Sequence, residues 1–260
     1  MNRWTQRSIK LAQHENYLDM LLDVYPMNPE TTRDIDPKKW SLVEKYYQSA
    51  DLSGLVSTLL TFELFPIKDS YIAYLKRDKS ALLRNPKTLK RVGNALIDMG
   101  LEGIKERCSE PKETNRQIGP MFRNWVKGGN LGIEISTNER EFRNSTRDMI
   151  LDLGDEALMK FANQHLNYKG LKGLDLIAKI GNEFIVGEAK FLTDFGGHQN
   201  AQFNDAITLV GNRTIKAITI AILDGVPYIE GNNKMSLAIR ESGKSNIMSV
   251  LVLKEFLNSR

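Results

Sequence analysis

The spacing of apolar residues divides the chain into a helical first half and a second half of short β-type runs. Apolar positions recur at helical spacing through 40–64, with an interruption at 51–54, and again through 69–83. The segment 87–99 forms one apolar stripe, and Gly100 fits the residue that follows a helix end. With a short helix over 101–107, this pair is a candidate helix-turn-helix, although packing alone accounts for many such pairs.

In the second half, one long helix over 143–165 is predicted before the pattern becomes β-rich. Strands are predicted at 173–180, 183–191, 215–223 and 248–253, with a helix at 200–210 between the second and third of them. This order predicts an α/β fold. Gly128-Gly129-Asn130 is the predicted junction between a mainly helical region, 1–130, and the α/β region, 131–260.

Composition narrows the class of protein only a little. Hydrophobic residues make up 41% of the chain and charged residues 26%, as in ordinary globular proteins. The longest strongly apolar run, 218–223, is too short to span a bilayer, and the first 17 residues lack the apolar block of a secretory signal. A single cysteine, Cys108, excludes an intramolecular disulfide and a cysteine zinc cluster. We therefore expect a cytoplasmic protein with no membrane partner.

The distribution of charge along the chain is more informative about a binding partner than the formal net charge of +4. Residues 76–127 contain 13 Lys or Arg against 6 Asp or Glu. A basic segment of this size suits a polyanion such as double-stranded DNA, because neutralised phosphates release counterions. Solvated helix faces would give the same pattern, so charge alone leaves both interpretations open.

The most informative segment is 173–190, where Gly181-Asn182 lies between two β-rich runs. This dipeptide predicts a two-residue hairpin turn, with Ile180 paired to Glu183. The same register sets Asp175 opposite Glu188. Since side chains alternate along a strand, Lys190 shares the face of Glu188, and Ala189 lies on the other face.

Two carboxylates and an ammonium on one patch of a sheet are costly without a ligand, because like charges repel and buried charges lose their hydration. A divalent cation removes this cost, since carboxylate oxygens are ligands that Mg²⁺ prefers. The cation could hold a scissile phosphate and acidify a bound water, while Lys190 stabilises the charge that develops. The set therefore points to phosphodiester hydrolysis. Acyl transfer fits poorly, because no Ser, Cys or His nucleophile lies nearby in the sequence.

These residues, Asp175 and then Glu188-Ala189-Lys190 on adjacent strands behind a helix, resemble the PD-(D/E)XK nuclease superfamily and, within it, the type II restriction endonucleases. Leu174 stands where the superfamily's pattern has a proline, a position that varies. The resemblance implies a restriction-endonuclease-like core, a central mixed β-sheet flanked by helices, beside a mainly helical N-terminal DNA-recognition region. It also implies Mg²⁺ as cofactor, with Asp175, Glu188 and Ala189 as metal-binding positions.

In that superfamily the preceding helix often adds an acidic residue. The candidates here are Asp148, Asp152, Asp155 and Glu156, of which Asp152 is favoured as a further catalytic residue.

Basic and amide side chains are candidate DNA contacts, since amides suit adenine edges and basic groups suit guanine or phosphate. They are Lys87, Lys90, Arg91, Arg116, Gln117, Arg123, Arg143, Arg147, His198, Gln199, Asn200 and Gln202.

The favoured hypothesis is a sequence-specific type II restriction endonuclease. Cutting both strands of a palindromic site implies a homodimer. Two alternatives stay open: a repair or structure-specific nuclease of the same fold, and a non-catalytic helix-turn-helix regulator that binds DNA without cutting it.

Overall fold

The computed structural model describes residues 1–13, 16–26, 32–111 and 117–260, and the chain forms two compact units. Unit 1 comprises Met1–Met27 and Thr114–Arg260, and unit 2 comprises Asn28–Glu113. Unit 2 is therefore an insertion in unit 1. These boundaries differ from the predicted division at 130 and 131, because the N-terminal helices and the helix before Gly128 pack against the core of unit 1.

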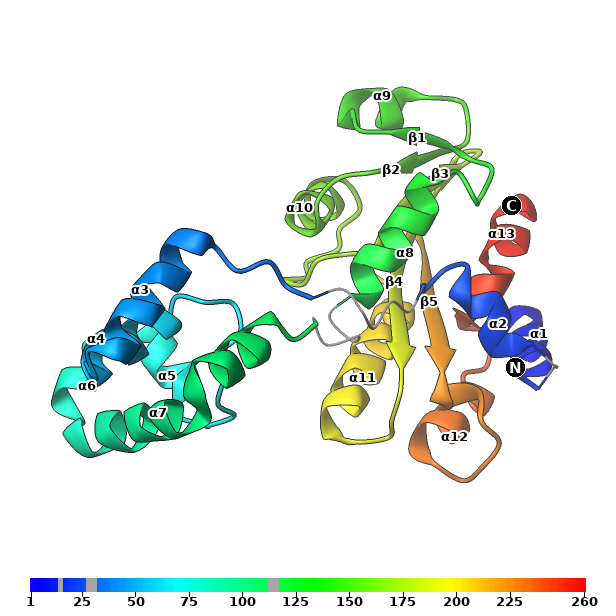
Figure 1. Ribbon diagram of the computed structural model, residues 1–260. Coiled ribbons are helices and arrows are strands. Elements are labelled where there is room, and N and C mark those ends of the chain that lie inside the picture. The colour runs from blue at the N-terminus through cyan, green and yellow to red at the C-terminus, as the bar shows by residue number, and fades with distance from the viewer. Residues whose placement is uncertain (14–15, 27–31, 112–116) are drawn as a thin grey trace. The chain divides into compact units, whose positions relative to one another are not determined.

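Unit 1 is built on a six-stranded mixed sheet in the order β1-β2-β3-β4-β5-β6 (Figure 1). The strands are β1 (Glu134–Ser136), β2 (Met149–Leu151), β3 (Leu176–Ile180), β4 (Glu183–Leu192), β5 (Ile218–Gly225) and β6 (Asn246–Met248). β3 runs antiparallel to β2 and β4, whereas the other neighbouring pairs are parallel. This arrangement confirms the predicted α/β class with a central mixed sheet.

Helices flank this sheet and bury its apolar residues in two main clusters. They are α1 (Arg3–Ala12), α2 (Tyr17–Leu22), α8 (Ile118–Lys127), α9 (Glu139–Asn144), α10 (Asp155–His165), α11 (Gly197–Gly211), α12 (Lys234–Arg240) and α13 (Val250–Asn258), with a 3-10 turn, η2 (Val226–Tyr228). On β4, Ile185 and Ala189 belong to the cluster that contains α8, whereas Val186 belongs to the cluster that contains α10. Side chains of β4 that point to opposite faces of the sheet thus pack into different clusters.

The N-terminal segment completes the far edge of this core. Thr5 Oγ1 donates a hydrogen bond to the carbonyl of Ile247 on β6 (2.7 Å), and both groups are buried. The ring of Trp4 packs edge-on against Phe256 of α13, with centroids 5.6 Å apart. Residues at opposite ends of the sequence therefore form one packed layer.

A buried carboxylate on β5 ties α2 and the residues after it to this layer. Asp224 is fully buried and accepts hydrogen bonds from Ser249 Oγ (2.5 Å), Tyr25 Oη (3.1 Å) and Tyr17 Oη (3.4 Å). Burial raises the pKa of Asp224 to about 6, although these hydrogen bonds favour the charged form and oppose the shift.

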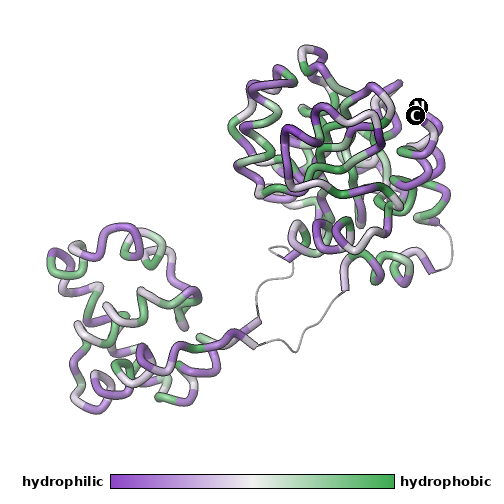
Figure 2. Tube along the Cα trace, turned by 90° about the horizontal axis from the view of Figure 1, so that it is seen from above, coloured by the Kyte–Doolittle hydropathy of each residue, from purple (hydrophilic) through white to green (hydrophobic). Residues whose placement is uncertain are grey.

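Unit 2 is helical throughout its described residues and has its own core. Its helices are α3 (Pro37–Gln48), α4 (Leu52–Leu59), α5 (Ile72–Arg77), α6 (Ala81–Arg84) and α7 (Pro86–Ser109). Inside α7, Gly100 has φ 79° and ψ 157°, so two helices meet there at a kink, as the sequence predicted. Figure 2 shows hydrophilic and hydrophobic residues alternating along these helices, the pattern expected when one side of each helix is buried.

Two sequence predictions were wrong in part. The long helix predicted over 143–165 is interrupted, because residues 149–151 form β2 and pair with both β1 and β3. The strand predicted over 248–253 is mostly helix: β6 ends at Met248, and the Ser249 side chain caps the start of α13. Among the helices that the structure describes, none combines the length and apolar character needed to cross a lipid bilayer.

Candidate functional site

The β3–β4 hairpin has the register that the Gly181-Asn182 turn predicts, with Ile180 paired to Glu183. Gly181 has φ 56°, in the left-handed region that glycine adopts without strain. The ladder extends to Leu176 opposite Gly187, and the N–H of Asp175 donates to the Gly187 carbonyl (3.2 Å). Asp175 therefore lies immediately before β3, beside Glu188 on β4.

The three ionisable groups predicted from the hairpin converge. Nζ of Lys190 lies 3.0 Å from Glu188 Oε1 and 3.2 Å from Asp175 Oδ2. The N–H of Ala189 donates to the same Oδ2 atom at 2.9 Å. One strand thus supplies a carboxylate, a main-chain donor and an ammonium around the carboxylate of its neighbour.

Partial burial strengthens these electrostatic interactions, because little water screens them. The side chains of Glu188, Asp175 and Lys190 are 10%, 15% and 22% exposed. Burial raises the pKa of Glu188, although the Lys190 ammonium opposes the shift. Burial alone would lower the pKa of Lys190, but the charges of Asp175 and Glu188 outweigh it and raise that pKa. Lys190 is therefore protonated at neutral pH.

The loop between α10 and β3 brings further groups to this site. Burial, followed by the negative charges of Glu188 and Asp205, raises the pKa of the Tyr168 hydroxyl. Asp205, on α11, forms an ion pair with Lys172 of the same loop. Sequence reasoning missed these residues, because they come from a loop and a helix that only the folded chain places near Glu188.

Asp152 lies near the site, but on a different element from the one predicted. It follows β2, and its Oδ2 lies 3.0 Å from Nζ of Lys127 on α8. Asp152, Lys127 and Asp175 line one small hollow, together with Arg123. The structure thus places Asp152 next to Asp175 through β2 rather than through a long helix.

The other acidic candidates face elsewhere. Asp148 accepts a hydrogen bond from the N–H of Gly181 at the hairpin turn (2.7 Å), at the other end of β3 from Asp175. Asp155 pairs with Arg123, and Glu156 pairs with Lys160 in an exposed contact.

The donor set suits a hard divalent cation such as Mg²⁺, which binds carboxylate oxygens. No group of three or more His, Cys, Asp and Glu with metal-binding geometry occurs among the described residues. The geometry instead offers two carboxylates whose repulsion Lys190 relieves. Such a pair fits a cation that keeps part of its water shell.

The candidate DNA contacts are spread over both units. Lys87, Lys90 and Arg91 are exposed on α7 in unit 2, where Arg91 forms an ion pair with Asp69. Arg116 lies outside the described residues, and Gln117 directly precedes α8.

In unit 1 these candidates differ in how they are held. Arg143 and Arg147 are exposed, and Arg147 pairs with Glu134 at 2.6 Å. Gln199 is buried, and its side chain bonds to Thr193, so it faces the interior rather than a ligand at the surface.

The remaining candidates lie in the first turns of α11 and on α8. His198 is exposed, and its Nε2 lies 3.3 Å from Nε2 of Gln202. Asn200 Nδ2 donates to the carbonyl of Phe195 (2.8 Å). Arg123 lines the same hollow as Asp175.

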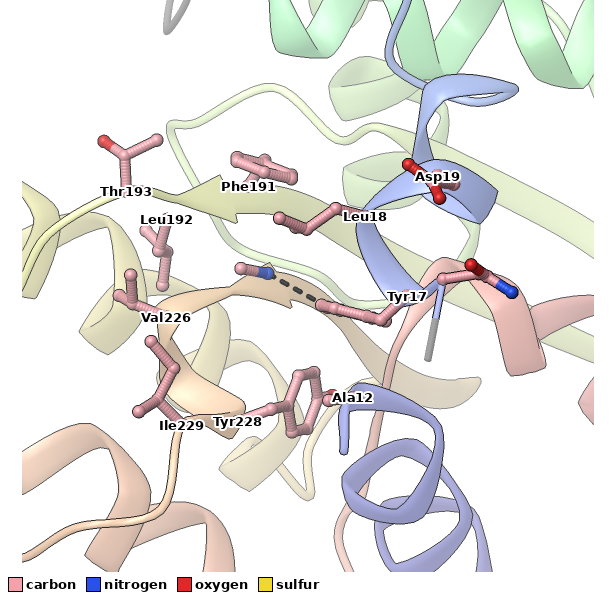
Figure 3. A pocket seen from close by; sticks show the side chains of 12 residues that line it. Ala12, Tyr17, Leu18, Asp19, Phe191, Leu192, Thr193, Val226, Tyr228 and Ile229 are labelled. Carbon is pink, nitrogen blue, oxygen red and sulfur yellow. Dashed lines mark hydrogen bonds between the residues drawn. The ribbon is translucent and has the colours of Figure 1, made fainter. Parts of the chain in front are cut away.

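A separate apolar cavity of about 590 Å³ lies beyond the ends of β4 and β5 (Figure 3). Leu192, Val226 and Tyr228 contribute to its lining, and the Tyr17 hydroxyl accepts a hydrogen bond from the N–H of Gly225 there (3.1 Å). Asp19 is the one carboxylate in its described lining, so the cavity lacks the paired acids of the Asp175 site.

A mixed sheet flanked by helices, with two carboxylates and a lysine on an internal hairpin, defines a restriction-endonuclease-like fold. A family model described as Tsp45I type II restriction enzyme matches residues 2–260. The chain therefore belongs to the Tsp45I type II restriction enzyme family, and it is a sequence-specific endonuclease that acts on DNA. No curated protein and no solved structure matched it.

Proposed function

We propose that this endonuclease cleaves double-stranded DNA with Mg²⁺ at the site formed by Asp175, Glu188 and Lys190. The observation that carries the proposal is the position of the Lys190 ammonium, 3.0 and 3.2 Å from the two carboxylates in a partly buried site. The carboxylates of Asp175 and Glu188 would hold the cation, and Ala189 would be the third metal-binding residue. Asp152 is a further acidic ligand in this proposal, because it lines a hollow with Asp175.

A bound Mg²⁺ would supply Lewis acidity and a more acidic water. The chain's own groups orient the reaction. Ala189 N–H fixes the Asp175 carboxylate by a 2.9 Å hydrogen bond, which pre-organises it at no cost during the reaction. Lys190, held protonated by its two neighbours, orients the attacking water and stabilises the negative charge on the phosphate oxygens. The attacking water loses a proton to solvent as its oxygen bonds to phosphorus, the bond to the leaving oxygen breaks, and that oxygen takes up a proton from solvent.

DNA recognition is proposed for the exposed lysines of α7 in the helical unit 2 and for the exposed basic groups of unit 1. Lys87 and Lys90 are exposed on α7, which bends at Gly100. The bend gives a pair of helices, the arrangement with which helix-turn-helix proteins enter a DNA groove. We also propose a homodimer, because two copies related by two-fold symmetry would cut both strands of a palindromic sequence. The family match favours a fixed sequence over the junctions or mismatches that a repair nuclease selects.

Digestion of a sequenced plasmid by the purified protein tests the proposal. With Mg²⁺ we expect discrete fragments, and none with excess EDTA. Asp175→Ala and Lys190→Ala should abolish the fragments, whereas Lys254→Ala, an exposed lysine on α13, should leave them unchanged. A smear in place of fragments would contradict a fixed sequence, and cutting by Asp175→Ala would contradict the proposed site.

A further inference from the structure

The loop that precedes Asp175 has a composition unlike a simple connection. It runs from Asn167 to Gly173 with the sequence NYKGLKG, between α10 and β3. Lys169 and Lys172 are exposed on either side of Leu171. Leu171 itself is 96% exposed, the highest value among the exposed large apolar residues of the described chain.

The backbone of this loop is held in place at several points. Asn167 and Lys169 have φ values of 55° and 56°, which residues other than glycine rarely adopt and keep only where their surroundings fix them. Asn167 Nδ2 donates to the Thr214 carbonyl (2.9 Å), and Asn163 Nδ2 donates to the Gly170 carbonyl (3.1 Å). The exposed leucine is thus presented by an anchored loop.

Two glycines allow the loop to pack closely against its neighbours, the Tyr168 ring and the start of α10. A Cβ atom at Gly173 would lie 2.6 Å from Cβ of Asp155, and one at Gly170 would lie 2.2 Å from the Tyr168 ring. The Tyr168 hydroxyl donates to the Lys172 carbonyl (3.3 Å), and its pKa is raised by burial and then by the charge of Glu188. The tip of the loop is therefore tied to Tyr168 and, through the ion pair of Lys172 with Asp205, to α11.

We propose that Leu171 is a wedge that enters the DNA beside the scissile phosphate, with Lys169 and Lys172 contacting the phosphates on either side. Apolar side chains that insert between base steps unstack them and bend the duplex, and lysines beside them neutralise the backbone. This inference rests on the proposed function, because it assumes that the phosphate is cut at Asp175, four residues after Leu171.

Double-stranded DNA fits this loop better than a protein partner does. Lysines flank the apolar side chain on both sides, Lys169 exposed and Lys172 paired with Asp205, and a protein interface centre is depleted of charged residues. Exposed single apolar residues are common on protein surfaces. Here, however, the residue is nearly fully exposed on an anchored loop that leads directly into the site.

Fluorescence of 2-aminopurine tests this wedge. The probe is a duplex that contains the cleaved sequence mapped from the plasmid digest, with 2-aminopurine placed in turn at each base beside the scissile phosphate. Binding by a Lys190→Ala protein should raise the fluorescence at one step, and Leu171→Ala in the same background should remove most of that rise. In the otherwise native protein, Leu171→Ala should slow cleavage by about tenfold or more, because a misplaced phosphate reacts slowly.

Two further variants separate a wedge from a general effect of substitution. Leu171→Phe keeps a bulky apolar group and should retain the fluorescence rise. Leu22→Ala, at a half-exposed leucine on α2, should behave as the unsubstituted protein does. Normal cleavage and an unchanged fluorescence rise in Leu171→Ala would overturn the wedge and leave the proposed function intact. A protein that cuts no DNA at all would overturn the proposed function, and the wedge with it.

Discussion

The main-chain N–H of Ala189 donates a hydrogen bond to Oδ2 of Asp175 at 2.9 Å. Ala189, which lies between Glu188 and Lys190 on β4, thus fixes the carboxylate that immediately precedes β3. Because this bond needs only an oxygen acceptor, the orientation of residue 175 can be separated from its charge by substitution.

Asp175→Asn should keep the fold and lose the activity. The amide oxygen can still accept from Ala189 N–H, whereas the negative charge that binds a cation is gone. Rates of plasmid cleavage should fall by about 10³-fold or more, as when a preorganised electrostatic group is removed from an active site. Asp23→Asn, at an exposed residue after α2, is the matched control. Full activity in Asp175→Asn would remove this residue from the proposed site.

Glu188→Gln should remove the thermal response to Mg²⁺. A ligand that binds only the folded protein stabilises it by about 2.7 kcal/mol at one hundred times its Kd, which raises Tm. Without Mg²⁺ the variant should melt at or above the temperature of the native protein, because burial disfavours the charged form of Glu188. Glu183→Gln, at the exposed start of β4, should keep the full response. An equal Mg²⁺ shift in Glu188→Gln would show that the cation binds elsewhere.

Asp152→Asn should lower the cleavage rate by about 10- to 100-fold, the usual cost of losing a supporting metal contact. Asp152 lines a hollow with Asp175, whereas Asp148 bonds to Gly181 at the distant turn. Asp148→Asn keeps an acceptor for that bond and should leave the rate unchanged. Steady-state rates over a range of Mg²⁺ concentrations distinguish the two, and the reverse ranking would exclude Asp152.

Stability should rise as the pH falls from about 7 towards 4, through the contribution of Asp224. Burial raises the pKa of this carboxyl to about 6 in the folded chain, above its value of about 3.9 in an unfolded one. Between these two values the folded state binds more protons, so the free energy of unfolding decreases as the pH rises. The full change is about 3 kcal/mol, since one pKa unit corresponds to about 1.4 kcal/mol.

Urea unfolding at several pH values measures this contribution. Asp224→Asn should lack it, and should also be less stable at low pH, because its NH₂ group cannot accept a hydrogen bond and either Ser249 or Tyr25 therefore loses its acceptor. The informative quantity is the difference between the two proteins at each pH, since other groups cancel. A difference that does not vary with pH would contradict the raised pKa.

Unit 2 should contribute to DNA affinity through phosphates. Lys87→Ala and Lys90→Ala each remove an exposed positive charge from α7 and should each reduce the salt slope of log K by about 1. Fluorescence anisotropy with a duplex at several salt concentrations gives the slope. Lys45→Ala, on α3 of the same unit, tests whether removing any exposed lysine of unit 2 reduces the salt slope equally. Unchanged slopes in the α7 variants would argue against DNA contact by this helix.

The convergence of Asp175, Glu188 and Lys190 was easier to predict from the sequence than the fold around them, for a physical reason. The Gly181-Asn182 turn sets its register locally, so the neighbours of Asp175 follow from counting along two strands. β2 depends instead on pairing with β1 and β3, which the local pattern of Met149-Ile150-Leu151 does not reveal. The same holds for Tyr168 and Lys127, whose positions near the site come from tertiary packing.

The apolar run after Ser249 shows a second limit. Four consecutive apolar residues fit a buried strand or a buried helix equally well by periodicity. Ser249 decides the matter, because its Oγ accepts from the N–H of Leu251 and starts α13. A serine before an apolar run was the available signal.

The packing of α1 against β6 and α13 has a consequence for how the enzyme is made. Thr5 and Trp4 find their partners at Ile247 and Phe256, so the ribosome must synthesise nearly the whole described chain before this layer can close. Unit 2 has its own core within Asn28–Glu113 and can fold much earlier. A nascent chain should therefore present a finished helical unit well before it has a complete nuclease core, which delays cutting until α13 has been synthesised.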